Sequence, residues 1–212
     1  MLILNKNILT IGGNRLEGGP LTPPVPPTDP YNPLGLPPNT VRVRTNDGNV
    51  PSSSSYYETA TLVSGTTDVY DVYKSGTSLN NLFRYAINVV EVLGANTSAI
   101  TEMTLMFMGS SSLTSVTLFD TSSVTTMNSM FQNCTSITSI PLFDTSNVTN
   151  MDSMFSSCLN VQSGALALYQ QASSQTNPPS SHHNTFSNCG HNTTTGAAEL
   201  AQIPSSWGGT GA

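Results

Sequence analysis

The apolar residues in the second half of the chain recur with a fixed period. The stretch LFDTSSVTTMNSMFQNCTSITSIP (118–141) is followed directly by LFDTSNVTNMDSMFSSCLNVQSGA (142–165), so one pattern is written twice with a period of 24 residues. A period in this range indicates stacked structural repeats, because a single unit of this size cannot bury its own apolar face. The positions in register are Phe119 and Phe143, Val124 and Val148, Met127 and Met151, Met130 and Met154, Phe131 and Phe155, and Cys134 and Cys158.

The pattern extends in both directions. Steps of 24 residues back from Phe131 reach Phe107 and then Phe83 in a more degenerate copy. TFSNCG (185–190) repeats MFQNCT (130–135) but follows its predecessor by 31 residues, which indicates an insertion within residues 165–184. Within that insertion, ALALYQQAS (165–173) predicts an ordinary helix. The sequence therefore predicts a ladder of like side chains, made by Phe83, Phe107, Phe131, Phe155, Met127, Met151, Cys134 and Cys158.

The spacing of apolar residues differs between the two halves of a unit. From Val124 to Cys134 the apolar positions are three or four apart, which favours one face of a short helix. From Ile137 to Leu142 they are three and two apart, which favours a short strand entered from a turn. We therefore predict an α/β solenoid with a short helix and a strand in each 24-residue coil.

The repeated motif L-F-D-T-S-x-V-T-x-M-x-x-M-F-x-x-C resembles the BspA-type leucine-rich repeat, found in bacterial surface proteins and in phages of gut bacteria. NTVRVRTNDGNVP (39–51) is also similar to segments that precede such repeats in gut Bacteroidetes phages. The resemblance covers residues 94–165 closely, and 76–93 and 166–203 more loosely. It implies a curved, single-layer solenoid used for binding, with no catalysis.

The segments that flank the repeats differ from them. Residues 1–19 are expected to hold one short strand, Met1–Leu4 or Ile8–Ile11. Residues 39–75 alternate apolar and polar positions around an Asp-Gly turn signal, which predicts a small β element that caps the solenoid. The solenoid then spans residues 76–212 and closes with a C-terminal cap over 196–209, in which Trp207 would cover the last unit.

Residues 20–38 contain nine prolines, which fix the backbone and remove hydrogen-bond donors. They predict an extended segment, and residues 1–38 together are interpreted as a docking arm that lies along another subunit. The alternative is a passive spacer. If the segment is an arm, its partner contacts would be Tyr31, Leu34 and Leu36.

Charge narrows the choice of partner. The net charge is −6, charged residues make up only 8% of the chain, and all six Lys and Arg residues lie at or before Arg84. A repeat surface with acidic groups and no basic ones repels phosphates and anionic lipids, so we expect neither nucleic acid nor membrane as a partner. The N-terminal residues lack the charged and long apolar regions of a signal peptide, so we expect release by cell lysis rather than export.

The three cysteines occupy equivalent positions in the repeats. Cys134, Cys158 and Cys189 each lie three residues after a ladder Phe, which favours reduced, buried packing residues over a disulfide or a metal site. His182, His183 and His191 cluster near Cys189, but their spacing matches no standard zinc site. We interpret the cluster as part of a polar loop, with His182 and His183 as outer contact residues.

The repeated acidic residues have a simple structural interpretation. Asp120 and Asp144 each precede Thr-Ser and an apolar run, which is typical of a residue that caps a turn or a helix. Calcium binding is the alternative, with Asp120, Asp144 and Asp152 as its candidates. No catalytic motif is found, so we expect neither an enzyme nor a cofactor.

These observations lead to one functional hypothesis. We expect a phage virion protein of the capsid-decoration or head-fibre type, anchored to capsid or tail proteins by its N-terminal arm. It would be a homo-oligomer or be present in many copies on each particle. Its Ser-, Thr- and Asn-rich repeats would contact host or glycan surfaces. The alternatives are a leucine-rich-repeat adhesin on a bacterial cell surface, a receptor-binding protein associated with tail fibres, and a solenoid that acts only as a spacer.

Overall fold

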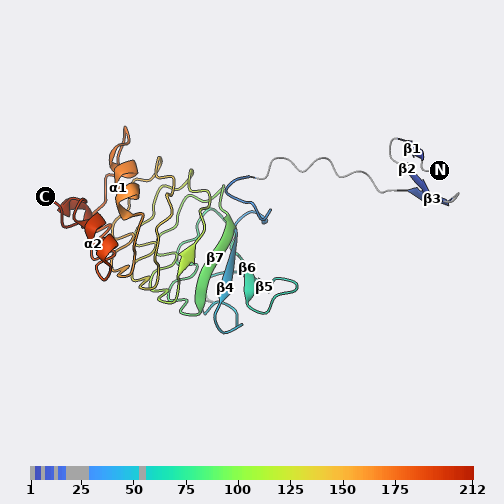
Figure 1. The fold of residues 1–212 in the computed structure, drawn as a ribbon, viewed down its shortest axis with the longest axis horizontal. Coiled ribbons are helices and arrows are strands. Elements are labelled where there is room, and N and C mark those ends of the chain that lie inside the picture. Colours follow the sequence, from blue (N-terminus) through green and yellow to red (C-terminus); the bar gives the residue numbers. More distant parts are fainter. Residues whose placement is uncertain (1–2, 6–7, 12–13, 18–28, 53–55) are drawn as a thin grey trace. The chain divides into compact units, whose positions relative to one another are not determined.

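The structure is a computed structural model that describes residues 3–5, 8–11, 14–17, 29–52 and 56–212. The chain divides into two compact units, Met1–Pro30 and Tyr31–Ala212. Residues 20–28 of the predicted proline-rich segment lie outside the described residues. Figure 1 labels the elements of both units.

The smaller unit is a three-stranded antiparallel sheet. Its strands are β1 (Ile3–Asn5), β2 (Ile8–Ile11) and β3 (Asn14–Glu17), in the order β1-β2-β3. The strand predicted over Ile8–Ile11 is confirmed as β2, whereas two further strands, β1 and β3, were not expected. The docking role of residues 1–38 stays a prediction.

The larger unit contains a five-stranded mixed sheet in the order β5-β6-β4-β7-β8. Its strands are β4 (Thr40–Thr45), β5 (Thr59–Leu62), β6 (Val69–Tyr73), β7 (Val89–Asn96) and β8 (Ser115–Val116). All neighbours are antiparallel except β7 and β8, which are parallel. Val41, Val43 and Val72 on β4 and β6 are fully buried, so this sheet covers one end of the apolar core.

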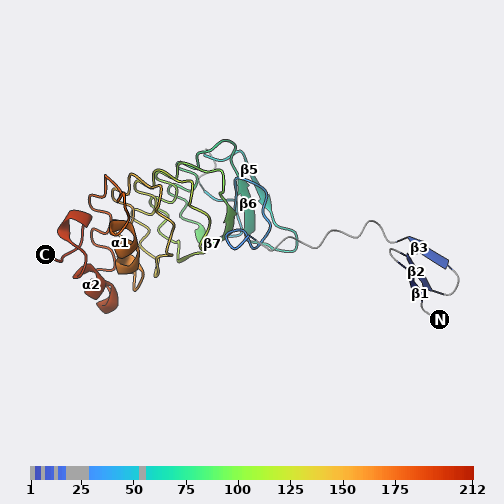
Figure 2. The ribbon, with the colours of Figure 1, turned by 90° about the horizontal axis from the view of Figure 1, so that it is seen from above.

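The described part of the chain has two α-helices, both after the best-preserved repeats. They are α1 (Ala165–Ser173) and α2 (Thr194–Leu200), followed by the 3-10 turn η1 (Ser205–Trp207). Figure 2 shows them at the opposite end of the larger unit from β5 and β6. The helix predicted over 165–173 is confirmed.

The predicted fold class is wrong. Residues 124–134 and their equivalents form turns rather than helices, and residues 137–142 form no strand. The larger unit is a small mixed sheet of five strands with two short helices, not an α/β solenoid with a helix and a strand in each coil. The reason is local: Ser129 and Asn133 have φ of 52° and 61°, and a left-handed residue ends a helix within one turn.

The 24-residue period nevertheless governs the hydrogen bonds. The amide of Phe83 donates to Met106 O at 2.7 Å, and that of Phe107 donates to Met130 O at 2.8 Å. Phe131 continues the series with an N–O distance of 2.9 Å to Met154. Isolated parallel bridges join Ser78, Glu102, Thr126 and Asn150 in the same manner. Equivalent residues are thus neighbours in space.

The aromatic rings follow the same register. Phe131 stacks between Phe107 and Phe155, with ring centroids 5.2 and 5.1 Å away. Phe83 and Phe186 extend the row at its two ends. The Met and Cys residues named with the ladder are fully buried beside it, namely Met127, Met151, Cys134 and Cys158. A fully buried Phe or Met contributes about 1.5–3 kcal/mol, so this row is the main apolar core.

The C-terminal segment meets the last of these turns. The amide of Phe186 donates to Trp207 O at 2.9 Å. The Trp207 side chain is buried, with Tyr169 edge-on at 5.4 Å and the His182 ring stacked on it at 4.2 Å. The rings of Trp207, Tyr169 and His182 therefore cover the apolar core at the end opposite the five-stranded sheet.

Candidate functional site

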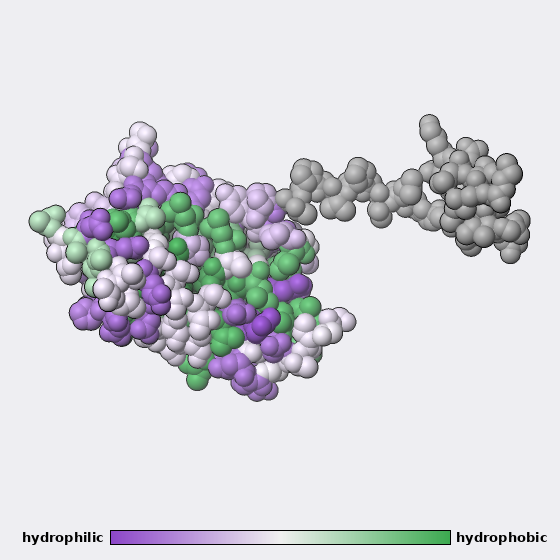
Figure 3. Space-filling model, viewed as in Figure 1, coloured by the Kyte–Doolittle hydropathy of each residue, from purple (hydrophilic) through white to green (hydrophobic). Residues whose placement is uncertain are grey.

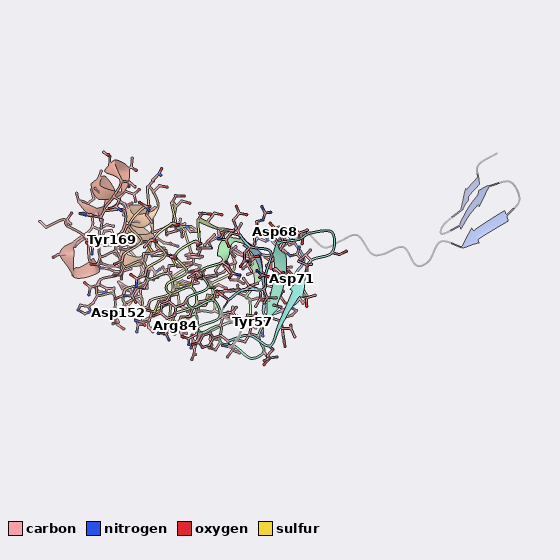
Figure 4. All side chains as sticks on the ribbon, turned by 90° about the horizontal axis from the view of Figure 1, so that it is seen from below. Tyr57, Asp68, Asp71, Arg84, Asp152 and Tyr169 are labelled. Carbon is pink, nitrogen blue, oxygen red and sulfur yellow. The ribbon has the colours of Figure 1, made fainter. Side chains whose placement is uncertain are left out.

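The ionisable side chains are spread over the larger unit. Figure 4 places Asp68, Asp71 and Tyr57 near the five-stranded sheet, and Asp152 and Tyr169 toward the helices. Among the described residues, the closest ion pair joins Arg42 and Asp71, opposite each other on β4 and β6, through bonds of 2.6 and 2.8 Å. This bidentate pair links two strands. Its position within a regular strand pair gives it a structural role.

Asp120 and Asp144 serve the turns in which they lie. Oδ1 of Asp120 accepts from the amide of Ser122 at 2.9 Å and from its hydroxyl at 2.7 Å. Oδ1 of Asp144 accepts from the amide of Ser146 at 2.8 Å. The interpretation of both residues as turn caps is confirmed. Among the described residues, no group of three or more His, Cys, Asp or Glu side chains could hold a metal ion.

The cysteines are free and buried. The thiols of Cys134 and Cys158 donate to the carbonyls of Phe107 and Phe131, each at 3.0 Å. Burial raises the pKa of all three thiols, including Cys189, above the ordinary value of 9.0. A thiol that stays protonated is a poor nucleophile and a poor metal ligand, so these residues act as packing groups.

The two adjacent histidines have different surroundings. His182 is half-buried, stacks on Trp207 and has Nδ1 3.0 Å from Pro179 O. His183 is exposed, its ring lies 3.8 Å from Asp152 Oδ1, and its amide donates to that oxygen at 2.7 Å. We predicted both as outer contact residues. Only His183 is exposed enough for that role, because His182 belongs to the cover over Trp207.

The three predicted partner contacts, Tyr31, Leu34 and Leu36, also differ in how exposed they are. Leu36 is 4% exposed, and its carbonyl accepts from Asn96 Nδ2 at 2.8 Å. A β-carbon at Gly94 would lie 2.8 Å from Leu34 Cδ1, so Gly94 is needed for this close approach. Leu36 therefore packs on β7 of its own chain, and its prediction as an exposed anchor is wrong. Tyr31 and Leu34 keep exposed surface of 36% and 45%.

A polar surface feature lies where the insertion meets the last regular turn. One hollow of about 560 Å³ is lined by Asp144, Ser146, Gln171, Ser174, Gln175, Thr176 and Asn177. A second, of about 370 Å³, is lined by Ser146, Asn147, Val148, Thr149, Asn177, Pro178 and Ser180. Ser146 and Asn177 line both, so the two hollows are parts of one surface, here called the insertion groove.

The insertion groove is built by α1 and by the segment that follows it. In Figure 1 this segment projects as a loop beyond α1, and Figure 3 colours it hydrophilic. Figure 3 also shows apolar surface on the face that carries β7. The loop is held to the turns at both ends, since Gln175 Nε2 donates to Thr145 Oγ1 at 2.6 Å and Ser180 Oγ to Thr149 O at 3.2 Å.

Sequence reasoning identified the insertion but not the groove. It favoured His182 and His183 as the outer contact residues, whereas the groove uses Gln171, Ser174–Asn177 and Ser180. The missed signal was the run of Gln, Ser, Thr and Asn after α1, which is unusually polar for a helix exit. Pairing that run with the turn 144–149 required the structure, because the seven extra residues shift the register.

Residues 54–194 match the family described as "Mycoplasma protein of unknown function, DUF285". The chain belongs to this family. The match includes all the 24-residue repeats and the insertion groove, and it ends at the first residue of α2. No curated protein and no solved structure matches the chain. No helix in the described part of the chain combines the length and the apolarity needed to cross a membrane.

Proposed function

We propose that this DUF285 protein is a non-catalytic structural protein of a phage virion, attached by its N-terminal unit and displaying its larger unit to a host or glycan surface. The observation that carries the proposal is the division of the chain into Met1–Pro30 and Tyr31–Ala212, each compact by itself. Two units joined by a proline-rich sequence suit attachment by one and contact by the other. The partners on the particle would be capsid or tail proteins, with the protein present in many copies.

The side chains of the repeats support a role without catalysis. Thr101, Thr125 and Thr149 each use the hydroxyl for a bond to the preceding turn, at distances of 3.1 to 3.3 Å. The thiols are buried and protonated at neutral pH. The polar groups of the turns thus stabilise the stack, and its outer surface is left for contacts that become strong through many copies.

The attachment is tested by deleting residues 1–30 in a phage that carries this gene. We expect the shortened protein, Tyr31–Ala212, to be missing from purified particles when their proteins are measured by mass spectrometry. The control is the full chain with Ser146→Phe, which alters the exposed surface of the larger unit and leaves the N-terminal unit intact. Normal incorporation of the shortened protein would contradict the proposal.

A bacterial cell-surface adhesin is the second candidate, because the description of the matching family names a bacterial genus. The two candidates differ in where the protein is found. Antibody labelling of intact bacteria and of purified particles separates them: surface label on cells without particles favours the adhesin, and label on particles favours the virion protein.

A further inference from the structure

The backbone carbonyls at one repeated position reveal where the stack ends. Ser98 O accepts from Ser123 Oγ of the next turn at 3.3 Å, and Ser122 O accepts from Asn147 Nδ2 at 2.6 Å. The next member of the row is Ser146 O. Among the described residues, no side chain donates to it, because the insertion places Asn177 and Pro178 beside Ser146 instead of another turn. At Ser146 this row of carbonyls therefore faces the insertion groove, whereas in the earlier turns the next turn covers it.

Further acceptors surround this edge. Asp144 and Asp120 are equivalent, but Ser122 Oγ donates to Asp120 whereas Ser146 Oγ donates to no described residue. The amide oxygens of Gln171 and Gln175, which both line the groove, are buried without a hydrogen-bond donor. Buried acceptors without a donor are rare in proteins, because each costs about 1–3 kcal/mol. The groove thus contains several acceptors that lack a donor.

The charge of the groove limits what can supply those donors. Its lining contains one carboxylate, Asp144, and no Lys, Arg or His. The whole chain after Arg84 has no Lys or Arg, so anionic ligands are repelled. A single carboxylate does not make a metal site. Its volume lies within the range typical of small-molecule sites, about 300–1,000 Å³.

We propose that the insertion groove binds a neutral saccharide. Sugar hydroxyls would donate to Ser146 O and to the Asp144 carboxylate, and would accept from the Asn177 amide. The amide groups of Gln171 and Gln175 turn toward the groove when the ligand enters, which gives their oxygens a donor. This inference rests on the proposed function, since it identifies the contact site and ligand class of a displayed binding protein.

The test uses the full-length protein on an array of neutral, sialylated and sulfated oligosaccharides, followed by calorimetry with the best neutral ligand. We expect neutral sugars to bind and acidic ones not to bind. Ser146→Phe fills the groove and is expected to weaken binding by at least about tenfold. The matched control is Ser122→Phe at the equivalent exposed position one repeat earlier, with an expected change within about twofold.

A second pair of variants tests the same site with smaller changes, in case the phenylalanine variants do not fold. Asp144→Asn keeps the shape of the groove and removes its charge, and its control is Asp120→Asn. Weaker binding of the neutral sugar by the first variant alone supports the assignment, with thermal unfolding confirming that all four variants fold.

The other outcomes contradict the proposal in different ways. Equal effects of Ser146→Phe and Ser122→Phe would overturn the site while leaving glycan display intact. Binding of acidic sugars alone, or of oligolysine in place of sugars, would overturn the ligand class. If no oligosaccharide binds, the saccharide site is rejected, whereas attachment through residues 1–30 is judged separately by incorporation into particles.

Discussion

Residues 120–125 and 144–149 are nearly the same sequence in two different environments. They differ only at Ser123 and Asn147. In the first segment, Thr121 Oγ1 donates to Asp144 O at 2.9 Å, so the next turn covers it. In the second, the equivalent Thr145 accepts from the Gln175 side chain, and the insertion groove opens beside it. The same residues stabilise a stack in one place and line the insertion groove in the other, because their neighbours differ.

The largest expected difference concerns two rings of the aromatic row, one in its middle and one at its end. Phe131 lies between two rings at 5.2 and 5.1 Å, whereas Phe186 stacks on Phe155 at 6.2 Å. Phe131→Ala is expected to lower the free energy of unfolding by about 3–5 kcal/mol, because the cavity has packed walls on both sides. Phe186→Ala should cost less. Denaturant unfolding measures both, and equal losses would contradict the comparison.

The buried thiols make stability depend on pH. Burial holds the pKa of Cys134, Cys158 and Cys189 above 9.0, the ordinary value that they regain on unfolding. Because the unfolded chain loses these protons first, their contribution is complete below pH 9 and declines as pH rises above it. The expected slope is at most about 1.4 kcal/mol per pH unit for each thiol.

The measurement is the free energy of unfolding between pH 7 and pH 10 under reducing conditions. Replacing all three cysteines by alanine should remove this part of the pH dependence, even though the variant is less stable at every pH. A slope that persists unchanged in the variant would show that other groups cause it.

Two buried threonines give a smaller and more local contrast. Thr121→Val leaves Asp144 O without its donor and is expected to destabilise the whole unit by about 1–3 kcal/mol. Thr145→Val instead releases the Gln175 side chain, which can turn toward solvent. We expect faster hydrogen exchange in residues 174–180 with little change in global stability. A global loss in Thr145→Val equal to that in Thr121→Val would contradict this distinction.

The smallest predicted effect concerns the one residue that differs between the two segments. Asn147 reaches the preceding turn with a bond of 2.6 Å, whereas Ser123 does so at 3.3 Å. Ser123→Asn is therefore expected to stabilise the protein by about 0.5 kcal/mol. Denaturant unfolding of this variant and of the reverse change, Asn147→Ser, should give shifts of opposite sign. A loss of stability in Ser123→Asn would refute the equivalence of the two positions.

Periodicity predicted which residues would meet, but not the backbone that brings them together. The rows of Phe, Met and Cys follow from a strict period of 24, because stacking like on like is the simplest way to bury them. The helix in each unit was wrong because apolar residues spaced by three and four also fit a turn with left-handed residues. Asn133 and Gly109, at equivalent positions with φ of 61° and 74°, were the available signal.

The insertion groove could not be predicted for a different reason. The sequence marks the insertion, but the polar residues after α1 have no periodic partner from which a contact can be inferred. Which atoms remain without a donor depends on how the loop lies over Ser146. The candidate site was therefore only partly predictable. The turn-capping role of Asp144 could be predicted from its repeat, but its position in the insertion groove could not.

The equivalence of the bonds between turns also makes the larger unit adjustable in length. Each added copy of the 24-residue pattern would offer the next one the same carbonyls and amides, so neither end would need to change. One copy corresponds to a step of about 4.8 Å between neighbouring rows of backbone. Duplication or loss of copies would thus move the insertion groove away from the five-stranded sheet, or toward it, in fixed increments. The number of repeats therefore sets the distance between the five-stranded sheet and the insertion groove, and it can change without changes to the two ends of the unit.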